Sequence, residues 1–91
     1  MPVREPRYSD AEFARRGGEI YDRDIRPQVD NDQNRGKYVL IDIETGAWEM
    51  DSDERVAAKR LDERVPDPQV WFLRVGLPSA VRFRVGRERR A

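Results

Sequence analysis

The sequence predicts an α+β domain with two layers: one helix crosses a mostly antiparallel four-stranded sheet, and a second helix lies at the N-terminus. Two apolar runs, YVLIDI and VWFLRV, and one alternating run, AVRFRV, are typical of strands. Apolar residues at helical spacing precede the first run and separate it from the second. The expected element order is therefore α-β-β-α-β-β, and a chain of 91 residues suits a single small domain.

The N-terminal part predicts an arm followed by a helix. Residues 1–8 contain two prolines and show no periodicity, so we expect a flexible arm. A helix is predicted over residues 9–27, because Ser9 can cap the first turn and Glu12 can reach back to it. The apolar residues that follow at near-helical spacing are Phe13, Ala14, Ile20, Tyr21 and Ile25.

Two features limit this helix. Gly17 and Gly18 interrupt it, and each glycine costs about 0.5–1 kcal/mol relative to alanine in a helix interior. We therefore expect a helix that is bent, frayed or dependent on packing. Pro27 disfavours helical geometry at Arg26, so the helix is expected to stop there. The polar stretch at 28–36 is predicted to be a linker.

The α+β domain itself is expected over residues 37–85, followed by a basic tail at 86–91. Its predicted elements are a strand at 38–43, a hairpin loop at 44–46, a strand at 47–51, a helix at 52–64, and strands at 70–75 and 80–85. Asp51 followed by Glu54 is the signal for the start of the helix. Strand order cannot be read from these patterns.

Charge is abundant and unevenly distributed. Charged residues make up 40% of the chain, and 18 basic residues balance 18 acidic ones. From Asp30 to Asp67 there are eleven acidic and six basic residues, whereas from Arg74 to Ala91 there are six arginines and one glutamate. The middle of the chain is therefore acidic and its C-terminal part is basic.

Several classes of site are disfavoured by composition. The chain has no cysteine and no histidine, so it lacks thiolate ligands, disulfides and the commonest general base. No apolar run approaches the roughly 18 residues that a membrane span needs, and no signal peptide is visible. We expect a cytoplasmic protein with no cofactor and no membrane partner.

One short stretch, YVLIDIETG, resembles the first motif of the DEDD-type 3′–5′ exonucleases. In that family the two acidic residues hold catalytic metal ions, so the resemblance implies a metal site at Asp42 and Glu44. Two carboxylates on one face of a strand suit Mg²⁺ or Mn²⁺.

The rest of the sequence departs from that family. The motif is one threonine short at Thr45-Gly46, and no later motif supplies the further carboxylates and the histidine or tyrosine that two-metal chemistry requires. We therefore interpret Asp42 as a residue that caps the hairpin, and we judge the likeness coincidental. A metal-dependent hydrolase at Asp42 and Glu44 remains a second alternative.

A longer stretch, residues 36–76, resembles a group of short prokaryotic proteins without an assigned activity. Its members share a Gly-Lys-Tyr-Val strand, an acidic hairpin, a helix opened by acidic residues and a strand ending in Arg-Val-Gly. The matching positions are Gly36, Lys37, Tyr38, Val39, Asp42, Gly46, Asp51, Arg74, Val75 and Gly76. Such small genes often lie beside a second small gene, so the resemblance implies an antitoxin-like or accessory protein.

The run VWFLRV offers apolar residues to both faces of the sheet, and one crossing helix covers only one face. The N-terminal helix, a second copy or another protein must cover the other. We therefore expect a non-enzymatic interaction module that binds a partner protein or itself through a sheet face or the N-terminal helix. The predicted partner-binding residues are Trp71, Phe72, Phe13, Ile20 and Tyr21.

The alternative is a nucleic-acid-binding accessory protein, because arginine-rich segments bind phosphate. The residues that would carry it are Arg82, Arg84, Arg87, Arg89 and Arg90. A solvated face, or pairing of these arginines with the acidic middle of the chain, is the favoured explanation of them, and a protein partner is the third.

Overall fold

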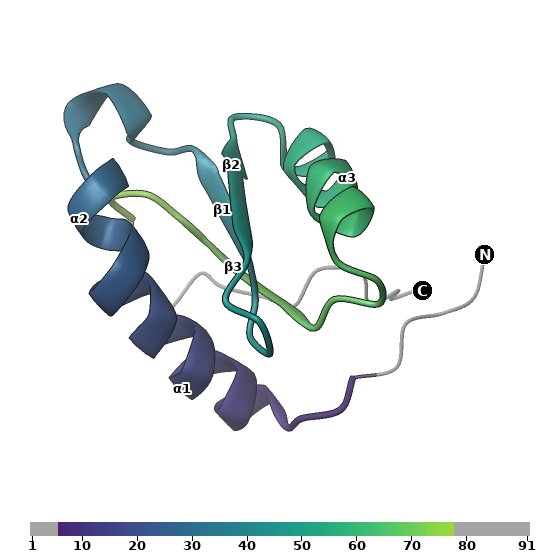
Figure 1. Ribbon diagram of the computed structural model, residues 1–91. Helices are drawn as coiled ribbons and strands as arrows, with labels where there is room; N and C mark the ends of the chain where they lie inside the picture. The colour runs from purple at the N-terminus through teal and green to yellow at the C-terminus, as the bar shows by residue number, and fades with distance from the viewer. Residues whose placement is uncertain (1–5, 78–91) are drawn as a thin grey trace, which may run out of the picture.

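The computed structural model describes residues 6–77, which form an α+β domain around a three-stranded antiparallel sheet (Figure 1). Its elements are α1 (Asp10–Ile20), a π-helical segment (Tyr21–Ile25), α2 (Arg26–Val29), a 3₁₀ helix (Asp32–Asn34), β1 (Tyr38–Asp42), β2 (Trp48–Asp51), α3 (Glu54–Arg64) and β3 (Val70–Arg74). The strand order is β2-β1-β3. The predicted fourth strand at 80–85 and the tail at 86–91 lie outside the described residues.

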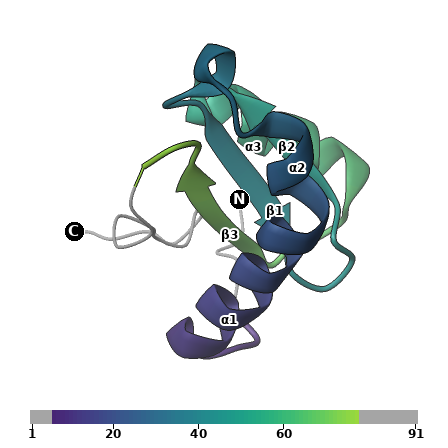
Figure 2. The same ribbon diagram turned by 90° about the vertical axis from the view of Figure 1, so that its left-hand side faces the viewer.

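The sheet has a helical layer on each face, so the domain has three layers where the sequence predicted two (Figures 1 and 2). The N-terminal helical segment, residues 10–29, covers one face, and α3 covers the other. The core between the N-terminal helical segment and the sheet consists of Phe13, Ile20, Tyr21, Ile25, Val29, Val39, Ile41, Ile43, Trp71 and Val75. The core under α3 consists of Leu40, Ala57, Leu61, Val70 and Phe72.

The central strand β1 explains the continuous apolar run in the sequence. Alternate residues of a strand point to opposite faces. Val39 and Ile41 therefore pack under the N-terminal helical segment, while Leu40 between them packs under α3. A strand buried on both faces has no polar side, and this is why its sequence does not alternate.

The edge strand β2 alternates as predicted. Trp48 and Met50 pack against the core on the side of the N-terminal helical segment. On the other side, Glu49 pairs with Arg64 of α3. The helix α3 starts two residues later than predicted, because the side chain of Asp53 accepts a hydrogen bond from the Arg55 N–H and caps its first turn.

Gly17 lets the N-terminal helical segment approach the sheet closely. A β-carbon placed on Gly17 would lie 2.9 Å from the Cγ atom of Trp71 and closer still to two other atoms of that ring. The indole therefore packs directly against the helix backbone. Gly18 is different, since a β-carbon there would have no atom within 4 Å. The glycine pair thus marks a contact with the sheet, and the helix runs through it without a break.

The predicted stop at Pro27 does not occur. Proline in a helix clashes with the carbonyl four residues earlier and cannot donate a hydrogen bond. The π-helical segment, which ends two residues before Pro27, widens the helix, and the N–H of Arg26 bonds to the carbonyl of Tyr21, five residues back. The helix then continues to Val29.

The stretch at 28–36 is more ordered than the predicted linker. Val29 is buried in the core, and residues Asp32–Asn34 form a 3₁₀ helix that the side chain of Asn31 caps. The single apolar residue of this polar stretch therefore anchors it to the sheet.

We expect opposite effects of alanine at the two adjacent glycines. Gly17→Ala should lower the free energy of unfolding by about 1–3 kcal/mol, because the added methyl group overlaps the Trp71 ring. Gly18→Ala should raise it by up to about 1 kcal/mol, because alanine favours the helix and the space is open. Urea unfolding monitored by Trp fluorescence measures both. Equal effects of the two substitutions would show that the indole does not contact Gly17.

Candidate functional site

The structure places all five predicted partner-binding residues in the core. Phe13, Ile20, Tyr21, Trp71 and Phe72 are each between 2% and 9% exposed. Trp71 and Phe72 do point to opposite faces as predicted, but the chain's own helices cover both faces. These side chains therefore hold the domain together, and only small parts of Tyr21 and Trp71 reach the surface, where they line a groove described below.

Asp42 is an internal hydrogen-bond acceptor at the end of β1. Its carboxylate accepts from the Thr45 N–H at 3.1 Å, from the Thr45 hydroxyl at 2.7 Å and from the Gln69 N–H at 2.8 Å. The side chain is 1% exposed. Asp42 thus closes the β1–β2 hairpin and ties it to the residues before β3, which agrees with its interpretation as a hairpin cap.

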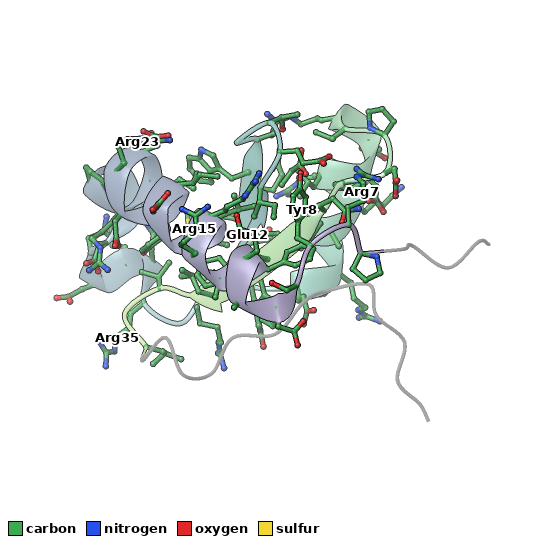
Figure 3. The ribbon with its side chains drawn as sticks, turned by 90° about the horizontal axis from the view of Figure 1, so that it is seen from below. Arg7, Tyr8, Glu12, Arg15, Arg23 and Arg35 are labelled. Atoms are coloured by element: carbon green, nitrogen blue, oxygen red, sulfur yellow. The ribbon has the colours of Figure 1, made fainter. Side chains whose placement is uncertain are left out.

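Glu44 lies in the hairpin loop and has different partners. Its carboxylate accepts hydrogen bonds from the Arg7 guanidinium at 2.6 and 3.1 Å and from the Tyr8 hydroxyl at 2.8 Å. These bonds, that of Arg7 first, lower the pKa of Glu44 to about 2. Arg7 also pairs with Asp67 at 2.8 Å. The last two residues of the predicted flexible arm, Arg7 and Tyr8, are therefore anchored beside α1 (Figure 3).

The contacts of Asp42 and Glu44 do not assemble a metal site. Because β1 ends at Asp42, the alternation of a strand does not extend to Glu44, and the two carboxylates serve separate hydrogen-bond networks. Within residues 6–77, no group of three or more histidine, cysteine, aspartate or glutamate side chains is arranged to hold a metal ion.

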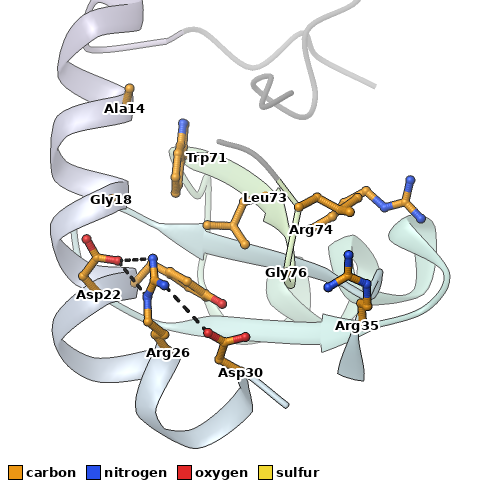
Figure 4. A pocket seen from close by; sticks show the side chains of 12 residues that line it. Ala14, Gly18, Asp22, Arg26, Asp30, Arg35, Trp71, Leu73, Arg74 and Gly76 are labelled. Carbon is orange, nitrogen blue, oxygen red and sulfur yellow. Dashed lines mark hydrogen bonds and ion pairs between the residues drawn. The ribbon is translucent and has the colours of Figure 1, made fainter. Parts of the chain in front are cut away.

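A groove that sequence reasoning missed lies between the N-terminal helical segment and β3 (Figure 4). Its volume is about 650 Å³. Seven of its lining residues are apolar or small: Ala14, Gly18, Tyr21, Trp71, Leu73, Gly76 and Leu77. The other five are charged: Asp22, Arg26, Asp30, Arg35 and Arg74. The groove exists because Gly18 has no side chain to fill the space beside the edge strand.

Two details of the groove concern polar groups. Among the charged lining residues, Arg26 pairs with Asp22 at 2.8 Å and with Asp30 at 3.7 Å, so these three charges neutralise one another in part (Figure 4). The indole N–H of Trp71 is buried and has no hydrogen-bond acceptor in the part of the chain that is described. Buried donors are normally paired, so this one indicates an acceptor that the described residues do not supply.

No protein-family model, curated protein or solved structure matches this chain. The class that the fold defines is a small α+β domain whose antiparallel sheet lies between two helical layers. None of the helices within residues 6–77 combines the length and the apolar character that crossing a membrane requires. The arginines at positions 82, 84, 87, 89 and 90 lie outside the described residues.

We expect Asp42→Asn to destabilise the domain. An asparagine amide cannot accept all the hydrogen bonds that the carboxylate accepts, so the free energy of unfolding should fall by about 1.5–3 kcal/mol. Thermal unfolding with and without Mn²⁺ provides the measurement. A melting temperature that Mn²⁺ raises in the wild type and leaves unchanged in Asp42→Asn would instead support a metal site.

The pKa of Glu44 predicts a dependence of stability on pH. Its pKa is about 2 in the fold against an ordinary 4.5, so its ion pair stabilises the fold fully above about pH 4.5 and is lost as the pH falls to about 2. Glu44→Gln has no carboxylate to protonate. Its melting temperature, measured by circular dichroism, should therefore fall less than that of the wild type across this window.

Glu12 supplies a second contribution in the same window, because Arg15 and then Arg16 lower its pKa to about 2. Glu12→Gln should likewise flatten the pH dependence, and the double variant should flatten it most. The same decline in wild type and Glu44→Gln would show that the Arg7–Glu44 pair does not form in solution.

Proposed function

We propose that this chain is a small non-enzymatic interaction module that binds a segment of a partner protein in the groove between the N-terminal helical segment and β3. The observation that carries this proposal is the groove itself, whose lining combines apolar and charged residues. A peptide segment brings apolar side chains for the apolar part of that lining and polar groups for the charged part.

The rest of the described surface supports this choice of site. Among the large hydrophobic residues of the described chain, Val56 alone is exposed, at 37%. The described helices therefore present no broad apolar patch. Interfaces need a desolvated apolar centre within a polar rim. The groove has both apolar and charged lining residues, whereas the sheet faces named by the sequence hypothesis are already covered.

The sequence supports a binding role over a catalytic one. The chain lacks histidine and cysteine, and the carboxylates of the acidic hairpin are engaged in holding the fold. The resemblance of residues 36–76 to short prokaryotic proteins encoded beside a second small gene suggests an antitoxin-like or accessory protein, and its partner would be the product of that neighbouring gene.

A groove-filling substitution tests the proposal. Gly18→Trp places a large side chain in the groove, where a β-carbon meets no atom within 4 Å, and Gly18→Ala adds only a methyl group at the same position. Each tagged protein is purified from its native host, and the eluate is measured by light scattering and mass spectrometry. We expect a stoichiometric second protein with the wild type and with Gly18→Ala, and its loss with Gly18→Trp.

The matched pair makes the outcome decisive. Both variants replace a helix glycine, so both should keep the helical circular dichroism signal and unfold at or above the wild-type temperature. Recovery of the same protein with Gly18→Trp would place its binding site elsewhere. Purification of a monomer without a second protein in all three cases would contradict the interaction module.

A further inference from the structure

Three basic residues differ from the others in the described part of the chain because they form no ion pair. Residues 6–77 contain twelve lysines and arginines, and nine of these pair with a carboxylate within 4.0 Å. The remaining three, here called the basic corner, are Arg35, Lys37 and Arg74. Carboxylates therefore neutralise most basic residues of the described surface, and the positive charge that remains unpaired is that of the basic corner.

The fold brings the basic corner together from two distant parts of the chain. The loop before β1 and the turn after β3 are joined by hydrogen bonds from the Gly36 N–H to the Val75 carbonyl at 2.8 Å and from the Val75 N–H to the Lys37 carbonyl at 2.9 Å. Arg35, in the loop before β1, and Arg74, at the end of β3, lie at the same end of the groove (Figure 4). Arg35 lies at the opposite end of the domain from Arg7 (Figure 3).

Each cation is positioned without being neutralised. The Arg74 guanidinium lies 4.7 Å from the centre of the Tyr38 ring, and its Nε donates to the Gly36 carbonyl at 3.0 Å. Its two terminal nitrogens form no bond with the described residues. Lys37 donates to the Asn34 side chain at 3.0 Å, and this neutral acceptor leaves its charge intact. The Arg35 side chain forms no hydrogen bond with the described residues and lies beside Gly76.

The sequence continues from this corner with more positive charge. Five arginines and one glutamate follow in residues 78–91, whereas residues 6–77 contain twelve basic and sixteen acidic residues. An otherwise acidic domain therefore has its unpaired cations at the point from which its arginine-rich segment begins. Several unpaired cations close together suit a ligand with regularly repeated negative charge.

We propose that the basic corner binds the phosphate backbone of a nucleic acid, with Arg35, Lys37 and Arg74 each contacting phosphate. An acidic protein segment is the rival ligand. The nucleic acid is favoured because the exposed Arg74 has its guanidinium over the Tyr38 ring and its two terminal nitrogens unbonded to the described residues, an arrangement that suits contact with phosphate and bases. This inference goes beyond the proposed groove function and does not depend on it.

The test measures binding of the full-length protein to a fluorescein-labelled oligonucleotide of about 20 nucleotides, single-stranded or duplex, by fluorescence anisotropy across a range of salt concentrations. The test variant carries Arg35→Gln, Lys37→Gln and Arg74→Gln. We expect at least a roughly tenfold loss of affinity at about 50 mM salt, and a slope of log K against log salt that is smaller by about 2–3.

The control variant removes the same number of charges from residues that are ion-paired: Arg15→Gln, Arg23→Gln and Lys59→Gln. It should bind within about twofold of the wild type, because these cations are already neutralised by carboxylates. Equal losses in the two triple variants would mean that only net charge matters and would overturn the assignment of the basic corner. Absence of binding by the wild type would overturn it as well.

Two further measurements complete the test. If the loss of Arg74 unfolds the protein, the double variant Arg35→Gln, Lys37→Gln keeps the stacking on Tyr38 and should still bind at least about threefold more weakly. Polyglutamate is the competitor that separates the two ligand classes: displacement of the oligonucleotide at equal charge concentration would identify an acidic protein site. Gly18→Trp should leave nucleic-acid binding unchanged, so failure of the groove proposal and failure of this one are distinguishable.

Discussion

The contact between Gly17 and Trp71 is the constraint on which the rest of the structure depends. The Trp71 ring lies directly against the backbone of α1, at a distance that any side chain at position 17 would prevent. This contact seats the N-terminal helical segment on the sheet. Once it is seated, helices of the chain itself cover both faces of the described sheet.

The two ends of the sheet differ in how their charged side chains are paired. At the end where β1 meets the hairpin, Asp42 and Glu44 accept hydrogen bonds from Thr45, Gln69, Arg7 and Tyr8, so polar groups are paired within the chain. At the other end, Arg35, Lys37 and Arg74 have no carboxylate within ion-pair distance among the described residues. Buried and paired polar groups hold a fold, whereas exposed and unpaired ones are available to a ligand.

The same helical segment also creates the groove. Gly17 brings α1 down onto Trp71, and the neighbouring Gly18 leaves a space between the helix and the edge of β3. Two adjacent glycines thus have two consequences, because successive residues of a helix point in directions about 100° apart. One removes a side chain that would separate the layers, and the other removes a side chain that would fill the groove.

The sequence by itself determined the strands β1, β2 and β3, the hairpin between the first two, and α3, because hydrophobic periodicity and turn residues are local properties of a chain. It also predicted that Trp71 and Phe72 point to opposite faces. Periodicity shows which residues are apolar on each face, but it does not show what covers them. Only the tertiary structure shows that the N-terminal helical segment covers this face, so that residues predicted to form a binding surface lie in the core.

Other features also depended on contacts between residues far apart in the sequence. Pro27 lies within a continuous helical segment because burial of Ile25 and Val29 holds that segment on the sheet. Arg7 is anchored by Glu44 and Asp67, which are 37 and 60 positions away. The composition shows that basic and acidic residues are equal in number, but it does not show which of them pair. An ion pair requires a distance of a few ångströms, and only the fold sets that distance.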